Sequence, residues 1–261
     1  MYCKLTVFHM MLRLIEVANL DGSFRAVLLS KDLDSPRAIA VNHKSGHMVF
    51  VDWSAVPRIE RADLDGTARQ VIVNQELGWP NGVTITEQER VIWADSKFGR
   101  IEQVDLNGRN RRILAESLPS PYGVTVLEGV LYFTLLANKT INRLNLSEEN
   151  NSRKDKTSSA SANHVEVYAR SLGNLVDIRA VDQAKRLAAL SLQSNMCQVN
   201  NGGCSHLCLR NSAPGYACKC PTGMTLLADE KTCNPGKHLC KLLLLFVYHW
   251  YLLSQTYHGN F

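Results

Sequence analysis

The feature that most constrains this chain is an internal repeat of about 42 residues, which points to a fold made of similar units. The tripeptide Leu20-Asp21-Gly22 recurs as Leu64-Asp65-Gly66 and, with Asn in place of Asp, as Leu106-Asn107-Gly108. Two further elements recur in phase with it, a proline-containing segment and a short apolar run that ends in Asp. The first begins at Ser35, Trp79 and Ser120, and the second is Val49-Phe50-Val51-Asp52 and Ile92-Trp93-Ala94-Asp95. Three elements in register argue against the alternative, a β-sandwich whose segments are similar by accident.

Each repeat divides into four short β segments. In the clearest unit we expect them at residues 37–42, 48–53, 57–63 and 68–73. Asp-Gly and Asn-Gly between the third and fourth segments are hairpin signals, because both residues tolerate the positive φ of tight turns. Four-stranded units of this length are typical of β-propeller blades. We therefore expect about four blades: the last two strands of one at 13–29, full blades at 36–73 and 80–114, a third with an insertion at 121–170, and an inner strand at 174–182.

The cysteines predict a second, smaller unit. Of the eight in the chain, six fall at Cys197, Cys204, Cys208, Cys218, Cys220 and Cys233. A segment this short needs covalent or metal cross-links to fold, and six cysteines allow 15 disulfide pairings. A zinc site that uses His206 is the alternative, but zinc knuckles place two to four residues between their cysteines, and only Lys219 separates one pair here. Disulfides are favoured, and with them an oxidising compartment. Cys3 and Cys240 have no obvious partner.

Both units resemble known families. The stretch CQVNNGGCSHLCLRNSAPGYACKCPTGMTLLADEKTC is similar to an epidermal-growth-factor-like (EGF-like) module of the non-calcium subtype. The repeats resemble class B repeats of the low-density lipoprotein receptor, whose second strand carries a Tyr-Trp-Thr-Asp motif. That motif stands at 49–52, at 92–95 and at 132–135, where Leu135 replaces the Asp. The phrases IERADLDG, GWPNGVTI and SPYGVTVLEGVLYF are most similar to the receptor-related proteins of the Wnt co-receptor group.

The resemblance implies a disulfide pairing and a domain plan. It pairs Cys197 with Cys208, Cys204 with Cys218, and Cys220 with Cys233. Six blades of about 42 residues close the ring in that family and need roughly 250 residues, so the chain is expected to be a fragment with a partial six-bladed propeller. We expect an irregular segment at 1–12, an incomplete propeller at 13–193, the EGF-like module at 197–233 and an unstructured or hydrophobic tail at 234–261.

Catalysis is not expected from these residues. Some six-bladed propellers are metal-dependent lactonases, and Asn81 and Asp95 are candidate metal ligands, but the other blades lack equivalents and no nucleophile, zinc or phosphate-loop motif is present. Neither a metal nor a cofactor is therefore predicted. The excess of 29 Lys and Arg over 24 Asp and Glu is too small to indicate a nucleic-acid partner.

Binding is the function that the fold favours. The loops that join the fourth strand to the first, and the second to the third, share one face of a propeller. They hold aromatic and basic side chains of the kind that dominate protein interfaces: Arg37, Trp53, Trp79, Asn81, Lys97, Phe98 and Tyr122. For Trp53 and Trp79, packing between blades is the alternative.

The resemblance implies Wnt proteins or their secreted antagonists as partners, with the EGF-like module as a brace beneath the ring. The alternatives are a basement-membrane adhesion protein of the nidogen type and an endocytic lipoprotein-type receptor. We expect the extracellular side of the plasma membrane, with membrane attachment only through parts of the parent type I receptor outside this sequence, because neither a clear signal peptide nor a transmembrane helix is present. Asn138, Asn145 and Asn150 begin glycosylation sequons.

Overall fold

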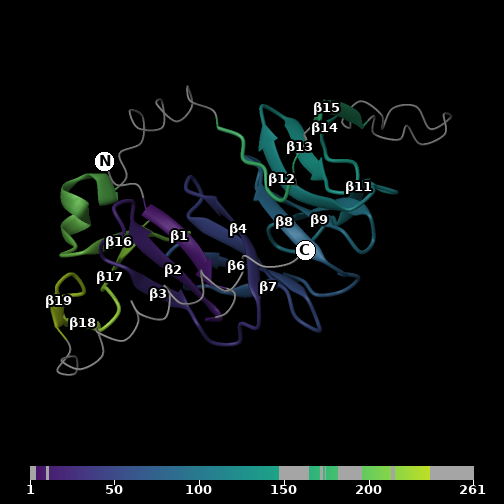
Figure 1. Ribbon diagram of the computed structural model, residues 1–261. Coiled ribbons are helices and arrows are strands. Elements are labelled where there is room, and N and C mark those ends of the chain that lie inside the picture. The colour runs from purple at the N-terminus through teal and green to yellow at the C-terminus, as the bar shows by residue number, and fades with distance from the viewer. Residues whose placement is uncertain are drawn as a thin grey trace, which may run out of the picture.

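The computed structural model describes residues 4–9, 12–146, 165–170, 173, 175–181, 196–212 and 215–235. Four antiparallel sheets follow one another along the chain, and a small module of two hairpins comes after them (Figure 1). One sheet has three strands and the other three have four. The module lies beside the first sheet, and the fourth sheet lies at the far end of the row (Figure 1). This arrangement confirms the predicted partial propeller followed by a disulfide-rich module.

The sheets are called blades 1 to 4 below. Blade 1 contains β1 (Lys4–His9), β2 (Leu14–Asn19) and β3 (Ala26–Leu29). Blade 2 contains β4 (Pro36–Asn42), β5 (His47–Asp52), β6 (Arg58–Asp63) and β7 (Gln70–Val73). Blade 3 contains β8 (Pro80–Ile85), β9 (Arg90–Asp95), β10 (Arg100–Asp105) and β11 (Arg112–Ala115). Blade 4 contains β12 (Pro121–Leu127), β13 (Val130–Leu135), β14 (Thr140–Asn145) and β15 (Glu166–Arg170). The segments expected in the clearest repeat match β4 to β7 to within two residues.

The second strand of each full blade is apolar because both of its faces are buried between neighbouring blades. In β5, Val49 and Val51 pack against blade 3, in a cluster that includes Trp93. Met48 and Phe50 point the other way and pack against blade 1. Successive side chains of a strand alternate between its two faces, so an uninterrupted apolar run serves two cores at once. Burial of both faces of the second strand therefore explains why the apolar run recurs in the sequence.

The Leu-Asp-Gly repeat closes the hairpin between the third and fourth strands. The carboxylate of Asp65 accepts hydrogen bonds from the backbone N–H and the hydroxyl of Thr67, at 2.9 and 2.6 Å. Gly66 has a φ of +87°, and a Cβ added to it would lie 2.8 Å from the carbonyl oxygen of Leu28 in blade 1. Glycine is therefore required here both for the backbone conformation and for the close approach of two blades.

The expectation of an irregular segment at 1–12 is wrong for residues 4–9. They form β1, which pairs with β2 along its whole length, from Lys4 opposite Asn19 to His9 opposite Leu14. The sequence KLTVFH contains β-favouring residues but none of the repeated elements, so the repeat alone did not reveal it. Residues 1–3, including Cys3, lie outside the described residues.

Residues 175–181 run extended beside β12, where the expected inner strand of a further blade would lie. The backbone N–H of Ala180 donates to the hydroxyl of Thr125 at 3.1 Å, and the backbone of Asp177 lies against Gly123. They form no ladder with β12. Within the described part of the chain, β1 is hydrogen-bonded to β2 alone. The described blades therefore form an open arc.

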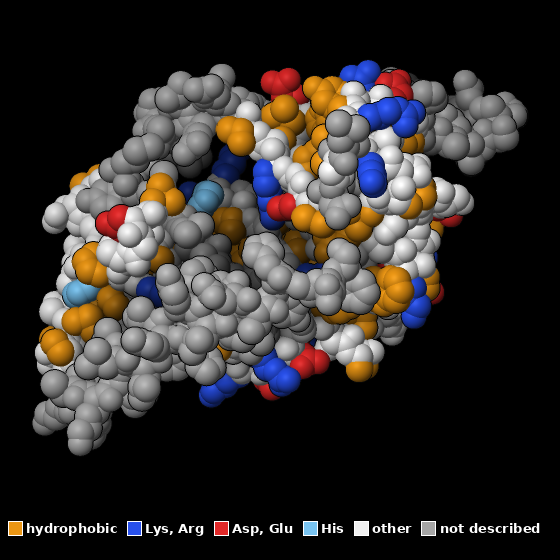
Figure 2. Space-filling view, in the orientation of Figure 1, with side chains coloured by type: hydrophobic (Ala, Val, Ile, Leu, Met, Phe, Trp, Pro, Cys, Tyr) orange, Lys and Arg blue, Asp and Glu red, His pale blue; other side chains and the backbone are white. Residues whose placement is uncertain are grey.

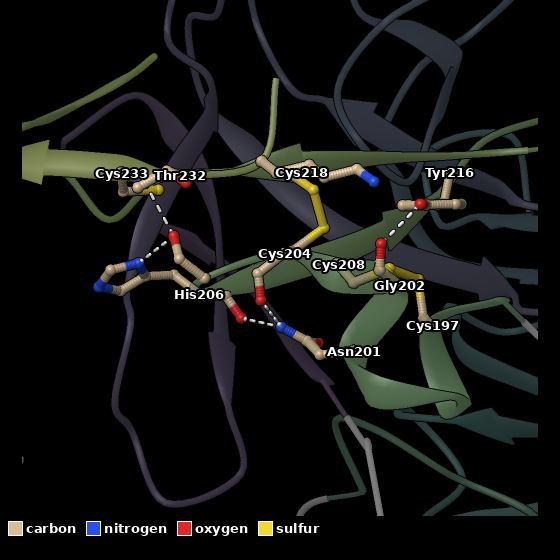
Figure 3. The surroundings of a disulfide bond; sticks show 12 residues. Cys197, Asn201, Gly202, Cys204, His206, Cys208, Tyr216, Cys218, Thr232 and Cys233 are labelled. Atoms are coloured by element: carbon tan, nitrogen blue, oxygen red, sulfur yellow. Dashed lines mark hydrogen bonds between the residues drawn. A yellow bond between two sulfur atoms is a disulfide. The ribbon is translucent and has the colours of Figure 1, made fainter. Parts of the chain in front are cut away.

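Three disulfides hold the C-terminal module, which contains η2 (Met196–Gln198), η3 (Asn200–Gly203), β16 (Leu207–Arg210), β17 (Tyr216–Lys219), β18 (Met224–Leu226) and β19 (Cys233–Pro235). They join Cys197 to Cys208, Cys204 to Cys218, and Cys220 to Cys233, the pairing that the resemblance implies. Asn201 and Tyr216 donate to backbone carbonyls around the first two bridges (Figure 3). β19 continues two residues beyond the predicted module end at 233. Residues 236–261, with Cys240, lie outside the described part.

The module packs beneath blades 1 and 2. Leu207 and Leu209 of β16 are buried against Val17 and Ala26 of blade 1. In blade 2, the carboxylate of Asp63 accepts hydrogen bonds from the backbone N–H and the hydroxyl of Ser212, at 3.1 and 2.9 Å. These contacts involve the turns opposite to the predicted ligand-binding face, so the module leaves that face open.

Candidate ligand-binding face

Two buried aspartates shape the loops of the predicted binding face. Asp95, at the end of β9, is fully buried. Its carboxylate accepts hydrogen bonds from four backbone N–H groups, those of Gly78, Trp79, Lys97 and Phe98, at 2.6 to 3.2 Å. The linker that enters blade 3 and the turn that leaves β9 are thereby tied to one side chain. Four such bonds fix the backbone at Trp79 and Phe98 and at the residue before each of them.

Asp52 has the same position in blade 2, and its carboxylate accepts from the backbone N–H groups of Asp34 and Ser35. In blade 4 Leu135 takes this place and is buried among apolar side chains. The Thr134 hydroxyl there accepts a single bond from the backbone N–H of Gly123, at 2.9 Å. The linker into blade 4 thus lacks the tie that the two aspartates provide.

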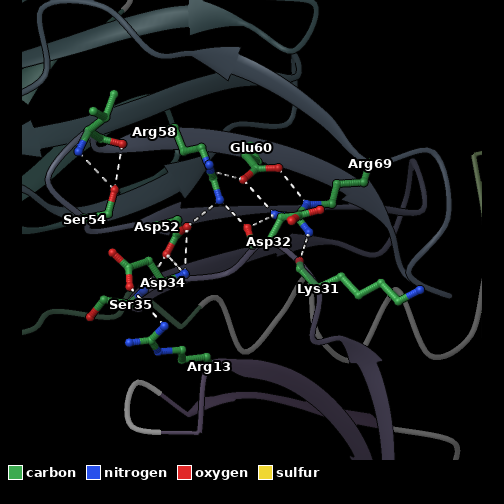
Figure 4. A network of polar contacts seen from close by, with 11 residues as sticks. Arg13, Lys31, Asp32, Asp34, Ser35, Asp52, Ser54, Arg58, Glu60 and Arg69 are labelled. Carbon is green, nitrogen blue, oxygen red and sulfur yellow. Dashed lines mark hydrogen bonds and ion pairs between the residues drawn. The ribbon is translucent and has the colours of Figure 1, made fainter.

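A buried glutamate between two arginines provides a second tie in blade 2 (Figure 4). The Glu60 carboxylate lies 2.6 Å from Nε of Arg58 and 2.7 Å from Nε of Arg69, and Glu60 is only 2% exposed. Arg69 also donates to the backbone carbonyls of Lys31 and Asp32, at 2.5 and 2.8 Å. The hydrogen bond to Glu60 raises the pKa of Arg69 above its ordinary value. We call Arg58, Glu60 and Arg69 the linker clamp, because Arg69 is hydrogen-bonded to the segment between blades 1 and 2.

Blade 3 repeats the linker clamp. Glu102 pairs with Arg100 and Arg111, at 2.7 and 2.8 Å, and Arg111 donates to the backbone carbonyls of Gln75 and Glu76. Part of the linker clamp is visible in the sequence, because β6 and β10 both begin with Arg-Ile-Glu. The second arginine lies nine residues beyond the glutamate, across a hairpin, and sequence analysis did not identify it. In blade 4 the step reads Thr-Ile-Asn.

At the centre of the arc, three residues predicted for the face occupy equivalent places. Arg37, Asn81 and Tyr122 each lie where the register between the first and second strands of a blade shifts. Such bulges re-aim a side chain out of the regular alternation. The guanidinium of Arg37 donates to the Tyr122 hydroxyl, and its carbon lies 4.7 Å from the ring centroid of Trp53. Arg37, Trp53 and Tyr122 therefore form one contact group.

Asn81 does not reach the open face. It is 8% exposed, and its amide donates to the Ser96 hydroxyl at 2.8 Å, which in turn donates to the carbonyl of Pro121 at 2.5 Å. The side chain serves as a tie between blades 3 and 4. The carboxylate oxygens of Asp95, the other candidate ligand of the lactonase alternative, are bonded to backbone amides. No group of three or more His, Cys, Asp or Glu suited to a metal occurs among the described residues.

The rim of the face exposes aromatic rings next to cations. Trp79 is 51% exposed and Phe98 is 44% exposed, so packing between blades does not account for Trp79. The guanidinium carbon of Arg100 lies 4.7 Å from the Phe98 ring centroid, and the Lys97 ammonium lies 5.9 Å from it. Trp53 is partly covered by Arg37. In the space-filling view, hydrophobic and basic side chains surround a hollow between the sheets (Figure 2).

Two of the three glycosylation sequons fall on described residues. Asn138 is exposed in the turn between β13 and β14, at the same end of blade 4 as the binding face. Asn145 is exposed at the opposite end of β14. Asn150 lies outside the described residues.

Comparison with known proteins agrees with this architecture. The family "Low-density lipoprotein receptor repeat class B" matches residues 12–43 and 46–85, which cover the end of blade 1, blade 2 and the start of blade 3. The family "Coagulation Factor Xa inhibitory site" matches residues 197–233, the EGF-like module. This chain is similar to the low-density lipoprotein receptor-related proteins in its repeats and in its module.

The curated relatives are much longer than this chain. It is 42% identical over 147 residues to low-density lipoprotein receptor-related protein 4 of Mus musculus, and 41% identical to that of Homo sapiens. These matches cover 56% of the chain and 7% of each relative. The chain thus spans a small part of the length of the curated relatives it matches.

Two solved structures share the fold. The structure titled as a nidogen/laminin complex superposes with a TM-score of 0.53 at 27% identity, over 62% of both chains. A gluconolactonase from Xanthomonas campestris superposes with a TM-score of 0.50 over 68% of this chain and 62% of its own, at 16% identity. At that identity the second likeness concerns the fold alone.

Proposed function

We propose that this receptor-related chain is an extracellular segment that binds a secreted protein through the candidate face, without catalysis. The observation that carries the proposal is the pair of half-exposed rings, Trp79 and Phe98, on loops that Asp95 holds in place. Aromatic and arginine side chains contribute most to protein interfaces. A loop fixed before binding loses little conformational entropy when the partner arrives.

The three disulfides and the position of the module support the rest of the proposal. Disulfides persist in oxidising compartments, which favours the extracellular side of the membrane. The module supports blades 1 and 2 from below. Among the described residues, no helix is long and apolar enough to span a bilayer.

Wnt proteins or their secreted antagonists are the partners we propose, on the resemblance of the repeats to the Wnt co-receptor group. The second candidate is a laminin-type matrix protein. It is favoured by the likeness, at 27% identity, to a structure whose title names a complex with laminin.

Binding to the intact chain separates the two candidates. A purified secreted Wnt antagonist and laminin are passed in turn over the immobilised protein, together with its Trp79→Ala variant. Truncating an exposed aromatic residue of the binding face is expected to weaken the true complex at least tenfold. Val71→Ala is the matched control, because Val71 is 43% exposed on β7, outside the face. If Trp79→Ala leaves an observed complex unchanged while circular dichroism shows an intact fold, the face is wrong; if neither protein binds, the proposed partners are wrong.

A further inference from the structure

We infer that the candidate face holds a carboxylate of its partner on the guanidinium of Arg37, so that the segment recognised is an acidic peptide. This inference rests on the proposed function, since it names the chemistry of the ligand at the same face. It depends on three observations about Arg37: its charge balance, its surroundings and its neighbours.

The first observation is that Arg37 lacks a negative partner. Most half-buried arginines of blades 2 and 3 are neutralised by carboxylates; Arg58 and Arg69, for example, both pair with Glu60. Among the residues that the structure describes, no ion pair joins Arg37 to a carboxylate, and its hydrogen bond goes to the neutral Tyr122 hydroxyl. A positive charge therefore remains uncompensated at the centre of the face.

The second observation is that the guanidinium is held in place and partly desolvated. Its carbon lies 4.7 Å from the ring centroid of Trp53 and 5.6 Å from that of Tyr122. Its Nε is buried and has no hydrogen-bond partner in the described part of the chain. Leaving a buried donor of a charged group unpaired is costly. A carboxylate would relieve this cost, because its two oxygens match the fork of N–H groups on a guanidinium.

The third observation concerns what surrounds the charge. A sulfated polysaccharide requires a band of unpaired cations, but Arg58 and Arg100 are compensated by Glu60 and Glu102, which leaves Arg37 and the exposed Lys97. A single free guanidinium with exposed aromatic rings on the same face fits one acidic side chain next to an apolar one. The half-exposed ring of Trp79 is suited to receive that apolar side chain. This combination favours a peptide segment that contains Asp or Glu.

The test selects the ligand without presupposing its identity. A library of random dodecapeptides displayed on phage is selected on the intact, disulfide-bonded chain, and the strongest binder is synthesised with blocked termini. We expect it to contain Asp or Glu, and we expect Asp→Asn or Glu→Gln in the peptide to weaken binding at least tenfold. On the protein, Arg37→Gln is expected to give a similar loss, and Arg37→Lys a smaller one, because lysine keeps the charge but loses the fork.

The outcomes separate this inference from the proposed function. If peptides bind in a manner that depends on Trp79 but not on their acidic residue or on Arg37, the face binds ligands and the carboxylate site is wrong. If heparin binds and displaces the selected peptide, and the peptide with Asn or Gln in place of its acidic residue binds as well as the original, the ligand is a sulfated polysaccharide and the inference is wrong. If no peptide binds although a secreted protein binds in a manner that depends on Trp79, the inference fails and the proposed function stands. The exchange of Asp for Asn in the peptide needs no protein variant, so misfolding of Arg37→Gln cannot mask the result.

Discussion

The guanidinium of Arg37 and the hydroxyl of Tyr122 meet across the arc, although the two residues stand 85 positions apart in the sequence. One belongs to the first strand of blade 2 and the other to the first strand of blade 4, with blade 3 between them in the chain. Both side chains leave their strands at bulges, so the contact depends on the curvature of the arc as a whole. It is therefore a sensitive reporter of how the blades are arranged.

Tyr122→Phe removes this hydrogen bond and keeps the ring. We expect the free energy of unfolding to fall by about 1 kcal/mol, the ordinary net value of an intramolecular hydrogen bond, as measured by urea denaturation. Tyr132→Phe is the control, because the structure shows the Tyr132 ring in an edge-to-face contact with Tyr168 and no hydrogen bond of its hydroxyl within the described residues. Equal losses in the two variants would contradict the contact across the arc.

Glu60→Gln tests the linker clamp. The substitution removes the buried counter-ion that Arg58 and Arg69 share, so that Arg58 keeps only Asp52. Breaking a buried pair typically costs about 3 kcal/mol or more. The matched control is Glu166→Gln, since the pair of Glu166 with Arg143 is exposed on both sides and such pairs contribute at most about 1 kcal/mol. Denaturation of both variants in parallel gives the comparison. A Glu60 variant as stable as the Glu166 variant would show that the clamp does not hold the linker.

Most of the fold could be predicted because each repeat contains two kinds of signal. Apolar runs such as 49–52 indicate buried strands, and turn residues such as Gly66 indicate hairpins. The sequence did not predict β1, which has no repeated element, or the second arginine of the clamp, because Arg69 meets Glu60 only once the hairpin has formed. It placed Asn81 on the open face, whereas the bulge turns the amide into a bond with Ser96. Local periodicity reveals strands and turns, but contacts between blades depend on curvature that no single repeat encodes.

Docking of the module onto blade 2 is expected to weaken in acid. Although His43 is exposed, partial desolvation and then the charge of Arg210 lower its pKa below the ordinary value of 6.5. Because the folded pKa is the lower one, the stability linked to His43 is fully present above about pH 6.5 and is lost as the pH falls through that value toward the folded pKa. Solvent still reaches part of the ring, so the effect is small.

Thermal unfolding of the intact chain and of His43→Gln at pH 7.5 and pH 5 measures this contribution. The wild-type chain is expected to lose more stability between the two pH values than the variant does. An identical pH dependence in both proteins would show that His43 does not sense acid at this junction.

Asn138 is expected to carry an N-linked glycan when the chain is secreted from eukaryotic cells. Its side chain is exposed in the turn between β13 and β14, as the side chain of a glycosylated asparagine must be. Mass spectrometry before and after enzymatic deglycosylation, with Asn138→Gln as the control, detects the modification. An unmodified Asn138 in secreted protein would contradict the expectation.

The central claim is that ligands bind on the face that carries Trp79 and Phe98, opposite to the module. Hydrogen–deuterium exchange of the intact chain, with and without the dodecapeptide selected on it, tests this directly. The account predicts slower exchange on binding in the turns at 53–57 and 96–99, and unchanged exchange in the turns at 43–46 and 86–89 on the opposite face. Protection confined to the latter pair of turns would contradict it.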